Sequence, residues 1–383
     1  MKSIGLFGIV ICFSLVSRGQ TPQFEVHKIG GFGEFGENMG ATALVDLNND
    51  GHLDFIYGQR GTMFWMEYIS PVEWKLRKFG SGARTDVGGV PHDVNRDGLT
   101  DFIVGDSWFE NTGNPEKEEF ILHRKNMIGT HDNVMVDIDG DGIEDVVAVS
   151  NDKEHNVTAW YKIPEDYTKN WDYTKIGDGI HGGAAPRGFG DLNNDGHMDI
   201  VRGDVWFENV NGDGKTWKEH PLIPPGGSRP DRFGLALKTW VADMNNDGMP
   251  DIVQAEGDTK NGRIFWWENV QNGKEFIFHL VSADSTGQDF HSLALADFNG
   301  NGYLDIASGG GPLTPGTRKL FVWENVSGDG SKWKEHLILS GYEVHEFVAG
   351  DVDNDGDIDI FSKPWKPGQH LYLENKMADK KKP

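Results

Sequence analysis

The chain contains 383 residues, of which 37% are hydrophobic and 25% are charged, and its formal net charge at pH 7 is −24. This acidic excess argues against nucleic acid as a partner, because phosphate binding requires an excess of lysine and arginine. The length is sufficient for a full hydrophobic core in one large domain or in a few smaller ones. With 51 glycines and 13 tryptophans, the composition favours many tight turns and short aromatic strands.

The N-terminal segment has the features of an export signal. Met1 and Lys2 precede an apolar run at 4–16, and a short polar stretch follows it at 17–20. Because the apolar run is too short for a stable membrane anchor, we predict a cleaved signal peptide over residues 1–20 and a secreted or periplasmic protein with no membrane span. The single cysteine, Cys12, lies in this segment, so we expect no disulfide in the mature protein.

One short motif recurs seven times along the rest of the chain. The first copy spans 46–54, and every copy keeps the pattern D-x-[DN]-x-[DN]-G-x-x-D, with successive copies starting 44 to 54 residues apart. Side-chain oxygens at positions 1, 3, 5 and 9, with a glycine at position 6 for the sharp turn, are what a hard cation of flexible coordination requires. The last ligand is an Asp at position 9, not a Glu at position 12, and the flanks resemble strands, which excludes an EF-hand. We therefore predict up to seven structural calcium sites.

The predicted calcium ligands occupy positions 1, 3, 5 and 9 of the seven copies. They are Asp46, Asn48, Asp50, Asp54, Asp93, Asn95, Asp97, Asp101, Asp137, Asp139, Asp141, Asp145, Asp191, Asn193, Asp195, Asp199, Asp243, Asn245, Asp247, Asp251, Asp297, Asn299, Asn301, Asp305, Asp351, Asp353, Asp355 and Asp359. These positions hold 22 of the 60 acidic residues, so the acidity is concentrated where a divalent cation would neutralise it. The alternative, Asx-type turns without metal, is strongest for the copy at 297–305, where Asn299 and Asn301 replace acidic residues.

Four short strands accompany each copy of the motif. Apolar strands flank it, as at 41–45 and 54–58; a third, aromatic strand ends in Glu-Asn, and a fourth follows a turn. Four strands repeated seven times predict an all-β, seven-bladed β-propeller. The seventh copy lacks its fourth strand, and we expect the strand at 24–29 to supply it and close the ring. The predicted organisation is a signal peptide (1–20), one propeller (21–376) and a disordered tail (377–383).

The motif, its flanking strands and the Trp-x-Glu-Asn signature at 206–209 and 266–269 resemble the FG-GAP/VCBS repeat family over essentially the whole mature chain. The Trp-Lys-Glu-His strands at 217–220 and 333–336 are similar to the propellers of secreted carbohydrate-active proteins of the aldos-2-ulose dehydratase type. This resemblance implies a propeller scaffold that acts on carbohydrate. The sequence contains no cupin domain of the kind that this type carries, so the resemblance does not extend to an identical substrate.

A set of chemically active residues stands at the starts of the innermost strands. Six residues before the first Asp of the motif, three of the seven copies have a histidine, namely His131, His291 and His345. Equivalent positions converge on the central channel of a closed propeller, at the end opposite the calcium loops. The residues predicted to lie nearby are Asp132, His181, Arg187, Arg232, Lys238, Tyr342 and Glu346.

Two kinds of chemistry fit this set. In a β-elimination, a histidine or Tyr342 removes a proton next to a carbonyl or carboxylate, Arg187 or Lys238 stabilises the enolate-like charge, and a second histidine protonates the departing oxygen. The unperturbed pKa of histidine, ~6.5, suits both proton transfers. Alternatively, the three histidines hold zinc or another divalent metal with an open position for substrate.

The leading functional hypothesis is a monomeric, secreted carbohydrate dehydratase or lyase that acts on sugars or uronate-bearing oligosaccharides during polysaccharide degradation. The alternative is a non-enzymatic carbohydrate- or protein-binding adhesion propeller that uses the same calcium-stabilised scaffold. A glycoside hydrolase is the weakest option, because no carboxylate pair stands outside the repeat. The outer-strand histidines recur with the blades, which favours a scaffold role for His27, His123, His220, His279 and His336.

Overall fold

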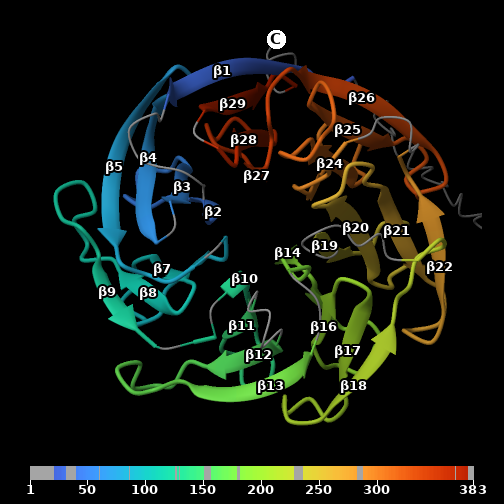
Figure 1. Cartoon of the computed structure of the whole chain (residues 1–383), viewed down its shortest axis with the longest axis horizontal. Helices are drawn as coiled ribbons and strands as arrows, with labels where there is room; N and C mark the ends of the chain where they lie inside the picture. The colour runs from blue at the N-terminus through green and yellow to red at the C-terminus, as the bar shows by residue number, and fades with distance from the viewer. Residues whose placement is uncertain are drawn as a thin grey trace, which may run out of the picture.

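The computed structural model describes residues 21–31, 40–59, 61–85, 87–125, 127–128, 130–150, 157–178, 182–227, 236–282, 288–366 and 368–377. Seven β-sheets surround a central axis like the blades of a propeller (Figure 1). The all-β, seven-bladed prediction is thereby confirmed. The predicted signal peptide and all but the first residue of the predicted tail lie outside the described residues, and that first residue, Met377, is buried.

Each blade has four main strands, numbered from the channel outward. Blades 1 to 3 comprise β2 (Thr42–Val45), β3 (Asp54–Gln59), β4 (Thr62–Ser70), β5 (Glu73–Ser81); β6 (Val90–His92), β7 (Asp101–Val104), β8 (Ser107–Glu110), β9 (Ile121–Arg124); and β10 (Thr130–Val136), β11 (Asp145–Ser150), β12 (Val157–Lys162), β13 (Asp172–Asp178). Blades 4 and 5 comprise β15 (Phe189–Gly190), β16 (Asp199–Arg202), β17 (Val205–Asn209), β18 (Trp217–Pro221); and β19 (Ala236–Ala242), β20 (Asp251–Gly257), β21 (Ile264–Asn269), β22 (Phe276–Leu280). Blades 6 and 7 comprise β23 (Ala294–Ala296), β24 (Asp305–Gly309), β25 (Lys319–Asn325), β26 (Trp333–Ser340); and β27 (Glu346–Gly350), β28 (Asp359–Lys363), β29 (Gln369–Asn375), β1 (Phe24–Gly31).

The ring closes through the N-terminal strand. β1 runs antiparallel to β29, with Phe24 opposite Asn375 and His27 opposite Tyr372, and forms the outer strand of blade 7 (Figure 1). This pairing confirms that the strand at 24–29 completes the last blade. Closure leaves no gap between the first and last blades, so the edge strands of the sheets face the channel and the rim.

The innermost strand of blade 4 departs from the regular pattern. Pro186 and Arg187 form β14, which pairs in parallel with Thr239 and Trp240 of blade 5, and only the short β15 remains in blade 4. Proline lacks the N–H that a continuous antiparallel ladder requires, so the strand breaks here. The break moves β14 toward the centre of the ring (Figure 1).

The hydrophobic core lies between neighbouring blades. Each of the seven blade interfaces contains its own cluster of buried side chains; between blades 1 and 2, for example, Trp65 and Phe79 pack with Phe102 and Phe109. Fully burying one phenylalanine contributes ~1.5–3 kcal/mol relative to leaving it exposed, so these contacts hold the ring together. The described residues contain no helix that is long and apolar enough to cross a membrane.

Candidate functional site

The acidic loops join the innermost strand of each blade to the second strand, so all seven lie at the same end of the ring. In the first loop, the carboxylate of Asp46 accepts the N–H groups of Asp50 and Gly51 at 3.1 and 2.9 Å, and Asn48 Oδ1 accepts the N–H of Asp50 at 3.2 Å. The first Asp of every other loop binds its loop backbone in the same way. These bonds turn the loop so that its side-chain oxygens gather on one side.

The aspartate at position 9 anchors each loop to the blade. Asp54 accepts the N–H of Leu47 at 3.1 Å and that of Tyr68 at 3.0 Å, so one carboxylate joins the loop to β4. Burial raises the pKa of the position-9 aspartate in every loop. The pKa is raised to about 7 for Asp54, Asp101, Asp145, Asp199 and Asp251, and to about 8 for Asp305 and Asp359. Ionising a carboxyl group buried in this way costs free energy, which a bound cation would offset, and carboxylate and amide oxygens are the donors that calcium prefers.

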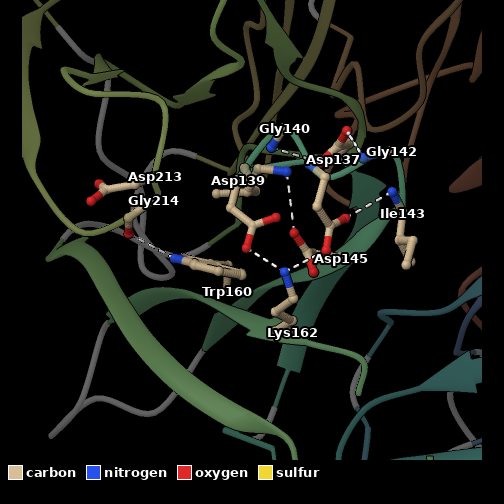
Figure 2. Close-up of polar contacts among 12 residues, drawn as sticks. Asp137, Asp139, Gly140, Gly142, Ile143, Asp145, Trp160, Lys162, Asp213 and Gly214 are labelled. Atoms are coloured by element: carbon tan, nitrogen blue, oxygen red, sulfur yellow. Dashed lines mark hydrogen bonds and ion pairs between the residues drawn. The ribbon is translucent and has the colours of Figure 1, made fainter. Parts of the chain in front are cut away.

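The loop of blade 3 differs from the others because a lysine enters it. The Lys162 ammonium binds the carboxylates of Asp139 and Asp141, the latter at 2.5 Å, and Figure 2 shows it beside Asp139. This ammonium lowers the pKa of Asp141. The equivalent third-strand position is a glutamate in the other six blades: Glu67, Glu110, Glu208, Glu268, Glu324 and Glu374. Sequence reasoning missed Lys162, although aligning the seven third strands would have revealed it.

The six glutamates fulfil a different role, which explains the recurring outer-strand histidines. His123, His220, His279, His336 and His27 each place Nε2 within 2.6 or 2.7 Å of the glutamate of their own blade. In blade 1, Arg77 replaces the histidine and binds Glu67. The pairs are therefore part of the repeated scaffold.

A cavity of about 280 Å³ lies along the central axis, between the innermost strands. Its lining is largely apolar, with Trp240 and Phe347 among its walls, and its polar groups include His131, Lys238 and Glu346. These three residues stand at or near the starts of β10, β19 and β27, at the end of the channel opposite the acidic loops. The starts of these three inner strands therefore meet at one cavity.

Buried ion pairs formed by residues of blades 3, 5, 6 and 7 meet at this end of the channel. His131 Nδ1 lies 2.9 Å from Asp132 Oδ1, and the other oxygen of Asp132 accepts the N–H groups of Ala184 and Ala185 at 2.9 and 3.1 Å. Burial alone would raise the pKa of Asp132, but the neighbouring His131 and Lys238 outweigh it and lower that pKa. Asp132 therefore remains a carboxylate.

Lys238 and Glu346 form a second pair across the channel. Their Nζ and Oε1 atoms lie 2.8 Å apart, and the residues are only 7% and 9% exposed. Burial opposes both charges, yet Lys238 lowers the pKa of Glu346 to about 2, and Glu346 and Asp132 raise the pKa of Lys238. The three charges of Asp132, Lys238 and Glu346 thus link blades 3, 5 and 7.

Two histidines lie behind Glu346, outside the cavity lining. The rings of His291 and His345 stack with centroids 3.8 Å apart, and each residue is 3% exposed. Burial opposes the charge of His291, but Asp258 and Glu346 outweigh it and raise its pKa to about 10. Burial lowers the pKa of His345 well below its usual value, and the positive charge of His291 adds to this effect. Asp258, which follows β20, was not identified from the sequence because it occupies no position of the repeat.

The structure brings together some of the predicted catalytic residues and separates others. His291, His345 and Lys238 all lie near Glu346, and His131 lies on the same cavity beside Asp132. Arg187 is exposed, with its guanidinium over the Phe189 ring, and it follows Pro186, which lines the cavity. Tyr342 is half-buried near the rim, where Lys28 of β1 lies over its ring. His181 and Arg232 lie outside the described residues.

Known proteins resemble parts of this chain. The FG-GAP-like repeat model matches residues 137–201 and 243–308, which span loops and strands of blades 3 to 6. Integrin alpha-6 of Gallus gallus is 31% identical over 135 residues, which cover 31% of this chain and 12% of that protein. A T-cell immunomodulatory protein homolog of Plasmodium falciparum is 27% identical over 131 residues, which cover 31% of this chain and 18% of that protein. The chain thus spans less than a fifth of the length of these two relatives.

A solved structure extends the likeness to almost the whole fold. It shows the recognition of non-reducing terminal N-acetylglucosamine by an Agrocybe aegerita lectin, with a TM-score of 0.56, 16% sequence identity, and coverage of 90% of this chain and 87% of that one. At this identity the likeness concerns the fold alone. The matches support FG-GAP-like repeats in a propeller, and the narrower likeness to the aldos-2-ulose dehydratase type is not confirmed by them.

Proposed function

We propose that this propeller with FG-GAP-like repeats is an exported binding protein that holds a carbohydrate ligand at the polar end of its central channel. The observation that carries the proposal is the buried Asp132–Lys238–Glu346 arrangement, which three separate blades bring to one cavity. Buried charges generally cost stability, so three of them in a concave site are better explained by ligand recognition than by folding.

The cavity has the chemistry that a sugar requires. Sugar hydroxyls are recognised by charged hydrogen-bonding groups such as Lys238 and Glu346, and the apolar face of a sugar ring packs on an aromatic side chain such as Trp240. The lectin with the similar fold recognises a sugar, and integrin alpha-6 is 31% identical to 135 residues of this chain, which supports a role in binding. Export is supported by the predicted signal at 1–20 and by the same integrin relative.

Calcium would stabilise this scaffold from the other end. In each loop the residues at positions 1, 3, 5 and 9 would hold the ion, whose two charges would offset carboxylates that the fold crowds together. The distance between the two ends separates structural and recognition roles, since β10, β19 and β27, which carry the site residues, have five to seven residues at ~3.3 Å each.

A glycan array probed with the mature, calcium-loaded protein tests the proposal. We expect binding to one class of glycan, and loss of that binding in Lys238→Met. The matched control is Lys218→Met, which removes an exposed lysine that pairs with Glu208 at 3.2 Å on the rim. Correctly folded protein that binds no glycan, or a Lys238→Met variant with unchanged glycan binding, would contradict the proposal. Binding to protein ligands alone would indicate an adhesion propeller.

A second candidate is the predicted carbohydrate lyase or dehydratase, favoured by the stacked imidazoles of His291 and His345 beside Lys238. One imidazole would remove a proton next to a carboxylate, Lys238 would stabilise the resulting negative charge, and the second imidazole would protonate the leaving oxygen. Tyr342, which lies near the rim, would have no part in this version. The test is the ultraviolet absorbance of a conjugated unsaturated uronate, and a panel of uronate oligosaccharides that gives none would exclude this activity.

A further inference from the structure

Three potential ligand atoms converge behind the Lys238–Glu346 pair. Glu346 Oε1 lies 3.6 Å from His291 Nδ1 and 3.8 Å from His345 Nδ1, and one potential ligand atom of each residue lies within 4.8 Å of those of the other two. We propose that His291, His345 and Glu346 form a binding site for one transition-metal ion of the zinc class, with a fourth position open to water or ligand. Two imidazoles and one carboxylate are the donors of a three-ligand zinc site.

The spacing of these atoms is close to what the metal requires. Bonds of about 2.0–2.1 Å in a tetrahedral arrangement place ligand atoms roughly 3.3–3.4 Å apart. The observed distances of 3.6 and 3.8 Å exceed this by a few tenths of an ångström. The Nδ1 lone pairs lie in the ring planes, and the two imidazoles stack only 24° from parallel, so both rings would also have to turn before one ion could contact both Nδ1 atoms.

A second observation points independently to a missing partner. Nδ1 of His345 is buried and has no hydrogen-bond partner among the described residues, although the residue is only 3% exposed. Leaving a buried polar atom unsatisfied costs about 1–3 kcal/mol, so such atoms are rare unless they serve a function. This atom faces Glu346 and would be satisfied by a metal ion.

Asp258 occupies the place of an outer-shell partner. Its Oδ1 lies 3.5 Å from His291 Nε2, on the side of the imidazole opposite the proposed ligand atom. A carboxylate in this position holds the proton on Nε2, and the metal would displace the Nδ1 proton of the charged imidazole to solvent. The contact of Nδ1 with the carbonyl oxygen of His345, at 3.3 Å, is long and would be given up.

Lys238 competes with the metal for Glu346. Its ammonium lies 2.8 Å from the same Oε1 atom, so a divalent ion would approach a carboxylate that already has a positive partner. Because of this repulsion, we expect Lys238→Met to raise the metal affinity, by about tenfold or more for a repulsion of about 1.4 kcal/mol. The proposed site does not depend on the carbohydrate ligand, and the metal alone is the probe.

Cobalt(II) and zinc(II) titrations of tag-free, calcium-loaded mature protein test the inference. We expect one Co²⁺ per chain with the intense visible spectrum of a four-coordinate site, and its displacement by Zn²⁺. His291→Gln or His345→Gln should lower the affinity by more than about 100-fold, since even an outer-shell change such as Asp258→Asn costs about 10–100-fold. His27→Gln is the matched control, because His27 lies with Glu25 and Glu374 in another group that could hold a metal.

Several outcomes would overturn the inference. They are a weak six-coordinate cobalt spectrum only, unchanged affinity in folded His345→Gln, and loss of the ion in His27→Gln but not in His345→Gln. If the histidine variants do not fold, the wild-type spectrum and the affinity of Lys238→Met still decide the question. Metal binding without glycan binding would refute the proposed function and leave the metal site in place. Glycan binding without metal binding would refute the metal site and leave the proposed function in place.

Discussion

The ammonium of Lys162 binds the carboxylate of Asp139 (Figure 2) and that of Asp141 within the acidic loop of blade 3. The loop of blade 7 also has four acidic residues at the corresponding positions, but its third strand carries Glu374 instead of a lysine. There, burial and the nearby Asp355 and Glu374 raise the pKa of Asp353. The same third-strand position thus places a positive side chain in the loop of blade 3 and a negative side chain near the loop of blade 7.

We predict that this lysine weakens calcium binding to the loop of blade 3. Lys162→Met should raise the calcium affinity of one site by about tenfold, because an ammonium no longer competes for Asp139 and Asp141. Direct calcium titration of metal-stripped protein would show one class of sites shifting to lower Kd. Lys218→Met is the control, since Lys218 binds Glu208 outside any loop. An identical calcium isotherm for Lys162→Met and wild type would contradict the prediction.

A second prediction concerns calcium removal and pH. In the calcium-free chain the position-9 aspartates have pKa values of about 7 or 8, well above the ~3.9 of an unfolded chain. The folded state therefore binds more protons than the unfolded state between these values, so the stability these groups contribute is present at low pH and is lost as pH rises toward 8. We expect the Tm of dialysed, metal-free protein to fall by several degrees between about pH 5.5 and 8, and excess calcium to restore most of the loss. A metal-free Tm that stays level or rises over this range would disprove this account.

A third prediction concerns the asparagine that ends the Trp-x-Glu-Asn signature. Asn269 is fully buried, and its side-chain amide donates to the carbonyl of Leu192 in the loop of the preceding blade at 2.8 Å. Asn209, Asn325 and Asn375 make the equivalent bond to the loop of the blade before them. Asn269→Ala should lower the free energy of unfolding by about 2–3 kcal/mol, because it leaves a buried carbonyl unsatisfied. Denaturant unfolding checks this value, and the exposed Gln271→Ala of the same blade should have almost no effect.

The sequence predicts much of this architecture because the repeat is strict. The seven motifs, the short strands and closure by the strand at 24–29 all follow from periodicity and turn chemistry. The break at Pro186 does not, because it depends on pairing with a strand about 50 residues later. The signature asparagines were visible as a pattern, whereas their bonds between blades require the ring itself.

The candidate site was predictable only in part. Counting back six residues from each motif located His131, His291 and His345, since the repeat sets their distance from the channel. This count does not predict where side chains outside the repeat point. It therefore could not show that Tyr342 lies near the rim or that Arg187 is exposed. Asp258 comes from a connection between β20 and β21 whose length differs among blades, so no repeat position identifies it.

A fourth prediction concerns the buried pair of Lys238 and Glu346. Lys238→Met should lower the free energy of unfolding by about 3–5 kcal/mol, because Glu346 then remains buried without its ammonium partner. Lys238→Met combined with Glu346→Gln should be less destabilised than Lys238→Met alone, since the uncompensated charge is removed as well. Chemical denaturation of the two variants and of Glu346→Gln completes a double-mutant cycle. Additive losses would show that the two side chains contribute independently, which the 2.8 Å contact argues against.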